Sequence, residues 1–167
     1  MRIIVDGYNL IRQSPSLSQI EDQDLEEGRR ELVRRLSDYQ RRKRHQILVV
    51  FDAAEGVHSS QKQEWVQGIS VTYSRRGETA DEVIKRLAAA GREGVVIITS
   101  DRELASFAER QGSTAIRSEE FEQRLMGSAG LFAKDLPEEE DFPRKKKGRA
   151  RRPSKAVRRR EAKLLRL

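Results

Sequence analysis

The chain has 167 residues, which suits one domain with an extension, and it contains no cysteine, which excludes disulfides and thiolate metal sites. Its formal net charge of +7 is unevenly distributed. Residues 144–167 contain 13 basic residues and one acidic residue, whereas residues 1–143 carry a net charge of −5. This asymmetry is typical of proteins that bind a polyanion, most often a nucleic acid.

No apolar run approaches the roughly 20 residues that a membrane-spanning helix needs. The first residues lack the apolar stretch of a signal peptide and enter a strand pattern at once. We therefore expect a cytoplasmic protein with no membrane partner.

The first part of the chain predicts two buried strands and one long helix. Ile3-Ile4-Val5 ends at Asp6-Gly7, and QILVVF at 46–51 ends at Asp52, as buried parallel strands do where the chain leaves a sheet. Residues 12–24 predict a loop, and residues 25–43 predict a helix with Asp24 as its N-cap. Residues 53–68 are weakly patterned and predict an irregular segment with a short helix around Trp65.

The second part alternates strands with helices. Strands are expected at 69–73, 94–99 and 114–116, and helices at 79–90, from Asp101 to about 111, and at 118–126. Such alternation predicts a mainly parallel sheet with helices on both faces, which is the α/β class.

Four aspartates are expected at one edge of this sheet. Asp6, Asp52 and Asp101 follow strands, and Asp81 lies in the first turn of the helix after the third strand. The carboxyl ends of parallel strands open at the same edge, where α/β sheets bind ligands. Carboxylates gathered there repel one another unless their pKa values rise or a divalent cation lies among them, and oxygen ligands suit Mg²⁺ or Mn²⁺.

Each acid also has a structural interpretation. Thr79 to Glu82 matches a capping box, and so does Ser100 to Glu103, so these acids would stabilise helix ends. Asp81 could also pair with Lys85 one turn further along its helix.

Other chemistries have little support. His45 and His58 are the only histidines, and neither has the partners of a Ser-His-Asp site. No phosphate-binding loop of the G-x-x-x-x-G-K-[ST] type and no G-x-G-x-x-G motif is found.

Four motifs carry a resemblance to a known family: IIVDGYNLI (3–11), VVFDA (49–53), GETADEVIKRLA (77–88) and VVIITSDREL (95–104). In order and spacing they resemble NYN-domain proteins of the PIN-like nuclease superfamily. The closer similarity is to the bacterial YacP-like branch, of which a ribosome-associated endoribonuclease is a member. The resemblance covers about residues 1–127, and it implies a PIN-like three-layer α/β/α sandwich.

The resemblance also implies metal-dependent endonucleolytic cleavage of RNA. With no histidine available, a metal-bound hydroxide is the expected nucleophile, and its in-line attack would leave 5′-phosphate and 3′-hydroxyl ends. The family's acidic metal positions fall on Asp6, Asp81 and Asp101, and its motif asparagine falls on Asn9, which would orient a water or the substrate phosphate. Asp52 and Glu82 are less certain metal ligands, since capping competes for Glu82.

Contacts to RNA are expected around the same edge. Arg75 and Arg76 would contact phosphates, Tyr8 would stack on a base, and Arg12 is a weaker candidate. A solvated turn and a packed loop anchor are the alternatives for the arginines and for Tyr8.

We divide the chain into a nuclease domain (1–127), an acidic linker (128–143) and a basic tail (144–167) whose residues from 154 onward could form a helix. The tail would supply affinity for RNA, mRNA or rRNA, or for the ribosome. Two other functions stay open: a PIN-like module that binds RNA or the ribosome without cutting, and a metal-dependent phosphatase. A common phosphatase pattern has an aspartate where this chain has Tyr8.

Overall fold

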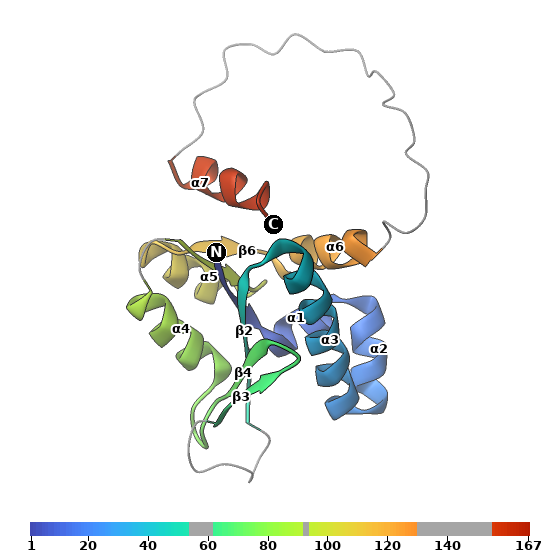
Figure 1. Cartoon of the computed structure of the whole chain (residues 1–167). Coiled ribbons are helices and arrows are strands. Elements are labelled where there is room, and N and C mark those ends of the chain that lie inside the picture. The colour runs from blue at the N-terminus through green and yellow to red at the C-terminus, as the bar shows by residue number, and fades with distance from the viewer. Residues whose placement is uncertain (54–61, 92–93, 130–154) are drawn as a thin grey trace, which may run out of the picture.

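The computed structural model describes residues 1–53, 62–91, 94–129 and 155–167 (Figure 1). Its centre is one six-stranded sheet in the order β3-β4-β2-β1-β5-β6. The strands are β1 (Arg2–Asp6), β2 (Gln46–Phe51), β3 (Lys62–Val66), β4 (Ile69–Tyr73), β5 (Val95–Ile98) and β6 (Thr114–Ile116). Every neighbouring pair is parallel except β3 and β4. The predicted α/β class and its mainly parallel sheet are confirmed.

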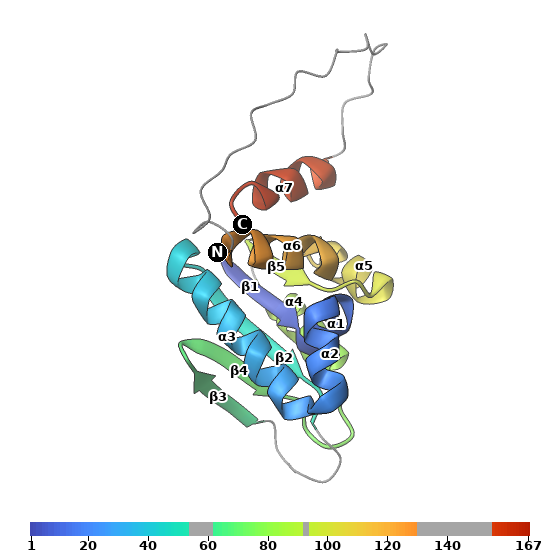
Figure 2. The same cartoon turned by 90° about the vertical axis from the view of Figure 1, so that its right-hand side faces the viewer.

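Helices cover both faces of the sheet, which gives three layers (Figures 1 and 2). They are α1 (Gly7–Gln13), α2 (Pro15–Gln23), α3 (Leu25–Lys43), α4 (Ala80–Ala90), α5 (Arg102–Arg110), α6 (Ser118–Ala129) and α7 (Lys155–Leu164). Side chains alternate along β1, so Ile3 and Val5 join a core with α1, α2, α3 and α6, whereas Ile4 joins a core with α4 and α5. Burial on both faces explains the continuous apolar runs of the central strands.

The prediction of a loop over residues 12–24 is wrong, because two capped helices occupy this stretch. Asp6 caps α1 by accepting a hydrogen bond from the Asn9 N–H, and Ser14 caps α2, which has Pro15 at its first position. Leu10 and Leu17 are fully buried. The polar appearance of the segment reflects its outer face and its caps, and its few apolar residues anchor both helices.

The prediction for residues 53–68 is also wrong where the structure describes them. Residues 62–66 form β3, an antiparallel edge strand, and no helix surrounds Trp65. Gln67 and Gly68 both have positive φ (52° and 84°), which is the backbone of a tight two-residue hairpin turn. Residues 54–61 lie outside the described residues.

The predicted α3 and α4 are confirmed with their caps. Asp24 accepts hydrogen bonds from the Glu26 and Glu27 N–H groups, and Thr79 with Glu82 forms a complete capping box. The second predicted box is wrong in one respect, since Asp101 and not Ser100 caps α5.

Helix α7 lies near the amino end of the chain, at the edge where the parallel strands begin (Figures 1 and 2). Leu167 is 4% exposed and belongs to the core cluster that also contains Tyr39 and Phe121. Its carbonyl accepts a hydrogen bond from the Tyr39 hydroxyl at 2.6 Å, and Lys163 Nζ donates to the Val95 carbonyl at 3.1 Å. The described end of the basic tail is therefore packed on the domain. Residues 130–154, which hold most of the expected linker and the rest of the tail, lie outside the described residues.

Candidate active site

The carboxyl edge is the edge of the sheet at which the parallel strands end, and all four aspartates lie along it. Asp6 is the last residue of β1, Asp52 follows β2, Asp81 lies in the first turn of α4, and Asp101 is the N-cap of α5. In the sheet, β2 and β4 lie on one side of β1 while β5 and β6 lie on the other. In α/β folds ligands bind at the carboxyl ends of the two strands between which the strand order reverses, and here these strands are β1 and β5.

Asp6 is the most buried of these acids, with 7% of its surface exposed. One oxygen accepts a hydrogen bond from the Asn9 N–H at 3.3 Å, and the other accepts from the Thr99 hydroxyl at 3.1 Å. Burial is the main reason that the pKa of Asp6 is raised to about 6. The two hydrogen bonds lower this pKa by less, and the negative charges of Asp81 and Asp52 raise it further. Asp6 therefore lies in a negative, poorly hydrated place.

Asp81 is half-buried, and its pKa is also raised. The largest cause is burial, followed by the negative charge of Asp101, while Lys85 acts in the opposite direction. Asp52 and Glu103 raise it further. The charges of Asp101 and Asp52 therefore act on Asp81, and those of Asp81 and Asp52 act on Asp6, so negative charge accumulates along this edge.

The remaining acidic side chains at this edge accept hydrogen bonds from backbone N–H groups. Asp101 Oδ1 accepts a hydrogen bond from the Leu104 N–H at 2.8 Å, and Asp52 Oδ1 accepts from the Ala80 N–H at 2.6 Å. Glu82 Oε2 accepts from the Thr79 N–H at 2.9 Å, as its capping role requires. Each of these bonds uses one carboxylate oxygen and fixes the orientation of the side chain.

The side-chain oxygen atoms at this edge are suitable ligands for a hard divalent cation. Asp6, Asp81 and Asp101 offer only oxygen atoms, which suit Mg²⁺ and Mn²⁺. Among the described residues, no three Asp, Glu or His side chains lie close enough together to ligate one ion directly. Mg²⁺ commonly keeps several waters and binds through only one or two carboxylates.

Asn9 supports the loop that carries Asp101. Its amide oxygen accepts hydrogen bonds from the Ser100 N–H at 2.8 Å and from the Ser118 hydroxyl at 2.7 Å. The bond to Ser118 ties α1 to the start of α6, and the bond to Ser100 ties it to the segment after β5. These two bonds use the amide oxygen of Asn9 and fix the orientation of its side chain.

Sequence reasoning missed three residues that organise this edge. The Thr99 hydroxyl donates to Asp6 and accepts from the Asp101 N–H at 3.1 Å, so it bridges two of the acids. The Ser100 hydroxyl donates to Glu119 and accepts from the Ser118 N–H. Thr99 and Ser100 precede Asp101 in one motif, which could have drawn attention to them, but nothing in the local sequence of Ser118 indicates its contact with Asn9.

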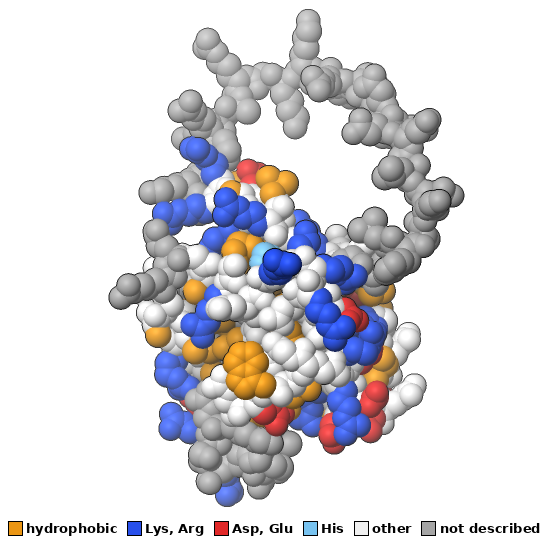
Figure 3. All heavy atoms as spheres, viewed as in Figure 1, with side chains coloured by type: hydrophobic (Ala, Val, Ile, Leu, Met, Phe, Trp, Pro, Cys, Tyr) orange, Lys and Arg blue, Asp and Glu red, His pale blue; other side chains and the backbone are white. Residues whose placement is uncertain are grey.

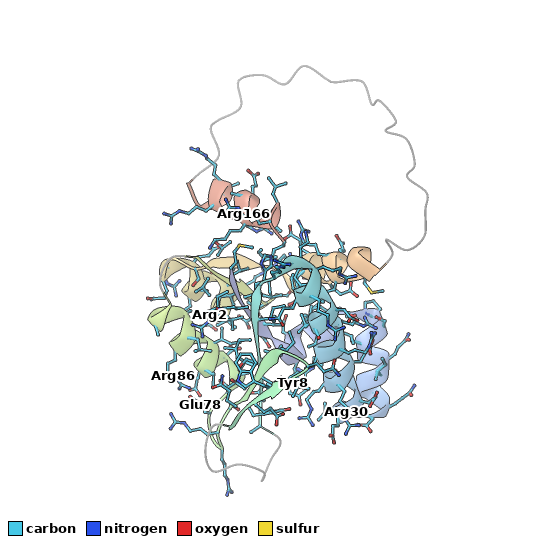
Figure 4. All side chains as sticks on the ribbon, in the orientation of Figure 1. Arg2, Tyr8, Arg30, Glu78, Arg86 and Arg166 are labelled. Atoms are coloured by element: carbon cyan, nitrogen blue, oxygen red, sulfur yellow. The ribbon has the colours of Figure 1, made fainter. Side chains whose placement is uncertain are left out.

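The residues expected to contact RNA differ in how deeply they are buried and in what they contact. Tyr8 is half-buried, packs edge-on against Phe51 with ring centres 5.2 Å apart, and has the Arg12 guanidinium 5.7 Å from its ring centre. Arg75 and Arg76 are exposed in the segment between β4 and α4, and Arg75 pairs with Glu78 at 3.2 Å. Figure 4 shows Tyr8 and Glu78 in the lower half of the molecule, while Arg166 of the carboxyl-terminal segment lies at the opposite end.

Comparison with known proteins identifies relatives in one bacterium. The uncharacterized protein YacP of Bacillus subtilis (strain 168) is 35% identical over 88 residues, which are 53% of this chain and 51% of YacP, so the chain spans about half the length of the curated relative it matches. A crystal structure of Rae1 (YacP) from Bacillus subtilis has a TM-score of 0.65 at 28% identity and covers 79% of this chain and 77% of its own. The crystal structure of its W164L mutant has a TM-score of 0.64 at 27% identity and covers 77% and 76%.

The sequence model of the YacP-like NYN domain matches residues 3–166. This range includes the carboxyl edge with its four aspartates and also α7. The expected three-layer architecture agrees with the structural similarity to Rae1 (YacP). The chain therefore belongs to the YacP-like NYN domain family.

Proposed function

We propose that this chain is a metal-dependent endoribonuclease that cleaves RNA phosphodiester bonds at the carboxyl edge. The observation that carries the proposal is the gathering of Asp6, Asp81 and Asp101 at the reversal of strand order. Burial and neighbouring negative charge raise the pKa of Asp6 and of Asp81, which is the electrostatic preparation that a cation site needs. Family membership supports a nuclease-type domain with RNA as its substrate.

Each residue has a role in this proposal. A bound Mg²⁺ or Mn²⁺ would activate a water and neutralise charge on the phosphate. Asp6, Asp81 and Asp101 would hold the ion, and Asp52 and Glu82 would add negative charge beside it. Asn9 holds the segment that carries Asp101, and its Nδ2 group donates to the substrate phosphate. Thr99 keeps Asp6 and Asp101 in a fixed relation.

Affinity for RNA comes from outside the acidic edge. Arg75 and Arg76 beside it and the basic residues of the tail attract phosphates, with Arg12 and Tyr8 as secondary contacts. We propose mRNA or rRNA as the substrate, acted on in the cytoplasm and on the ribosome. In the described part of the chain, no helix combines the length and apolarity that a bilayer crossing demands.

The test is cleavage of an end-labelled RNA by the purified full chain in Mn²⁺, in Mg²⁺ and in EDTA, with the RNA free and with it in translating ribosomes. The double variant Asp81→Asn/Asp101→Asn should lose at least about 100-fold in rate, the size of loss seen when one stabilising catalytic group is removed. Asparagine at position 101 retains the N-cap, so the fold should persist. Asp22→Asn, an exposed acid on α2, is the matched control and should cut normally. Cutting that is unaffected by EDTA and by the double variant would refute the metal site.

The second candidate is a module that binds RNA or the ribosome without cutting. The absence of three directly ligating side chains among the described residues favours it, as does the structural use of the Asn9 amide oxygen. Tight ribosome binding without cleavage of free or ribosome-bound RNA would establish this alternative.

A further inference from the structure

Trp65 is the only tryptophan in the chain, and 73% of its surface is exposed. It lies on the edge strand β3, directly opposite Ser70 of β4. Figure 3 shows hydrophobic side chains at the surface over β3 and β4. A large aromatic side chain left in water is costly, and exposed aromatics therefore often mark binding surfaces.

A groove of about 260 Å³ adjoins this tryptophan, and we name it the Trp65 groove. It is lined by Arg2, Gln40, Gln46, Ile47, Leu48, Gln63, Trp65 and Ser70. Gln63 Nε2 donates a hydrogen bond to the Ser70 hydroxyl at 2.9 Å, which fixes one wall. The groove is smaller than the roughly 300–1,000 Å³ that encloses a drug-sized ligand, so it suits a single flat group.

We propose that the Trp65 groove binds an unstacked base of single-stranded RNA. The base would stack on the Trp65 ring, a contact that every base can make. The amides of Gln40 and Gln46 both donate and accept hydrogen bonds, which suits the edge of a base, and the exposed Arg2 guanidinium suits a neighbouring phosphate. This inference rests on the proposed function for its substrate class and extends the RNA contacts beyond the carboxyl edge.

The surrounding charge favours RNA over a protein partner. Arg2 pairs with Val95 in the sheet, and the Val95 carbonyl accepts a hydrogen bond from Lys163 of α7, so the groove and α7 lie at the same end of the molecule. Arg158 and Arg166 are exposed in this carboxyl-terminal segment, where Glu161 is the only acid. Amide side chains and the Arg2 guanidinium beside one aromatic ring complement a base with its phosphate better than they complement an apolar protein surface.

The groove is within reach of a strand that also contacts the carboxyl edge. Leu48 pairs with Ser70 beside the groove, and Phe51, which immediately precedes Asp52, pairs with Tyr73. Three residues along a strand span roughly 10 Å. The groove therefore lies roughly 10 Å from the carboxyl edge along β2, a distance that a short single strand of RNA exceeds.

Because Trp65 is the only tryptophan, its fluorescence reports on this groove directly. The experiment uses the full chain carrying Asp81→Asn/Asp101→Asn in EDTA, so that no RNA is cut, and titrates it with a ten-residue oligouridylate and with an RNA duplex of equal charge. We expect saturable quenching by the single strand and little quenching by the duplex. In the same background, Trp65→Ala should weaken binding of labelled oligouridylate by about 5–100-fold, measured by anisotropy, and Trp65→Phe should weaken it less.

Leu25→Ala is the matched control, since Leu25 is an exposed apolar side chain (43%) at the start of α3. It should leave RNA affinity unchanged. Unchanged fluorescence on addition of RNA, or equal affinity in the Trp65→Ala variant, would overturn the proposal and leave a protein as the occupant to consider. RNA binding is measured without cleavage, so the two proposals fail separately. If the protein cuts RNA in a metal-dependent way but Trp65→Ala does not weaken RNA binding, only the groove proposal is refuted. If RNA quenches the Trp65 fluorescence but the wild-type protein cuts no RNA, only the nuclease proposal is refuted.

Discussion

Replacing Asp6 with asparagine should stabilise the metal-free protein at neutral pH. Asp6 is 7% exposed, and its pKa rises from 3.8 to about 6 on folding, chiefly because burial disfavours its charged form. Above pH 6 the carboxylate is charged in both states, so folding must bring a charge into a poorly hydrated place. Asparagine removes that charge while keeping an oxygen that can accept from the Asn9 N–H.

The size of the effect follows from the pKa difference of about two units. Each unit corresponds to about 1.4 kcal/mol, so the ionised carboxylate costs the folded state about 3 kcal/mol. The folded state binds the Asp6 proton more tightly than the unfolded state does. The free energy of unfolding therefore falls as pH rises from about 4 to 6, and the contribution of Asp6 to it is constant at higher pH. For a chain of this length, the Asp6→Asn gain corresponds to a Tm increase of roughly 6–12 °C.

The assay is thermal unfolding followed by circular dichroism from pH 4 to pH 8 in EDTA, repeated with Mg²⁺ or Mn²⁺. The two proteins should melt at similar temperatures near pH 4 and diverge up to about pH 6–7. Added cation should stabilise the wild type selectively and narrow the gap, since a cation that binds the folded state raises its stability. Asp22→Asn controls for the loss of one surface charge.

The reasoning fails if Asp6→Asn is less stable than the wild type at pH 7.5 in EDTA. It also fails if the difference between the two proteins is the same at pH 4 and pH 8, because a pH-independent offset would reflect packing and not ionisation.

Three further predictions concern other parts of the molecule. Gly7→Ala should destabilise the fold by about 1–3 kcal/mol in urea unfolding, because a Cβ there would clash with the Phe51 ring; no loss would mean that the ring can move. Tyr39→Phe should cost about 1 kcal/mol through the lost bond to the Leu167 carbonyl, and an unchanged urea midpoint would contradict that bond. The double variant Arg158→Gln/Arg166→Gln should reduce the slope of log affinity for single-stranded RNA against log salt by about 1.4, and an identical slope would exclude this helical segment from RNA binding.

The central strands and the long helices could be predicted because their sequence patterns depend on local physics. Continuous apolar runs such as residues 46–51 require burial on both faces, and Asp24 and Thr79 are helix caps whose partners lie three residues away or fewer. Parallel topology then places Asp6 and Asp101 at one edge, whatever the details of packing.

The errors arose where the stabilising contacts are distant in sequence. Helices α1 and α2 depend on a few side chains such as Leu10 and Leu17, which meet a core made largely by other elements. Strand β3 is held by pairing with β4, and its outward-facing residues give no alternating signal. Ser118 lies 109 residues from Asn9, and a contact between two short polar side chains at that separation leaves no local pattern.

The bond between the Tyr39 hydroxyl and the Leu167 carbonyl joins residues 128 positions apart, which has a consequence for how the chain folds as it is made. Synthesis proceeds at roughly 5–20 residues per second, so the 38 residues after α6 take about 2–8 s to appear. During that interval the core around Tyr39 and Phe121 lacks Leu167. This core is therefore completed only after residue 167 has been synthesised, later than every other element that contributes to it.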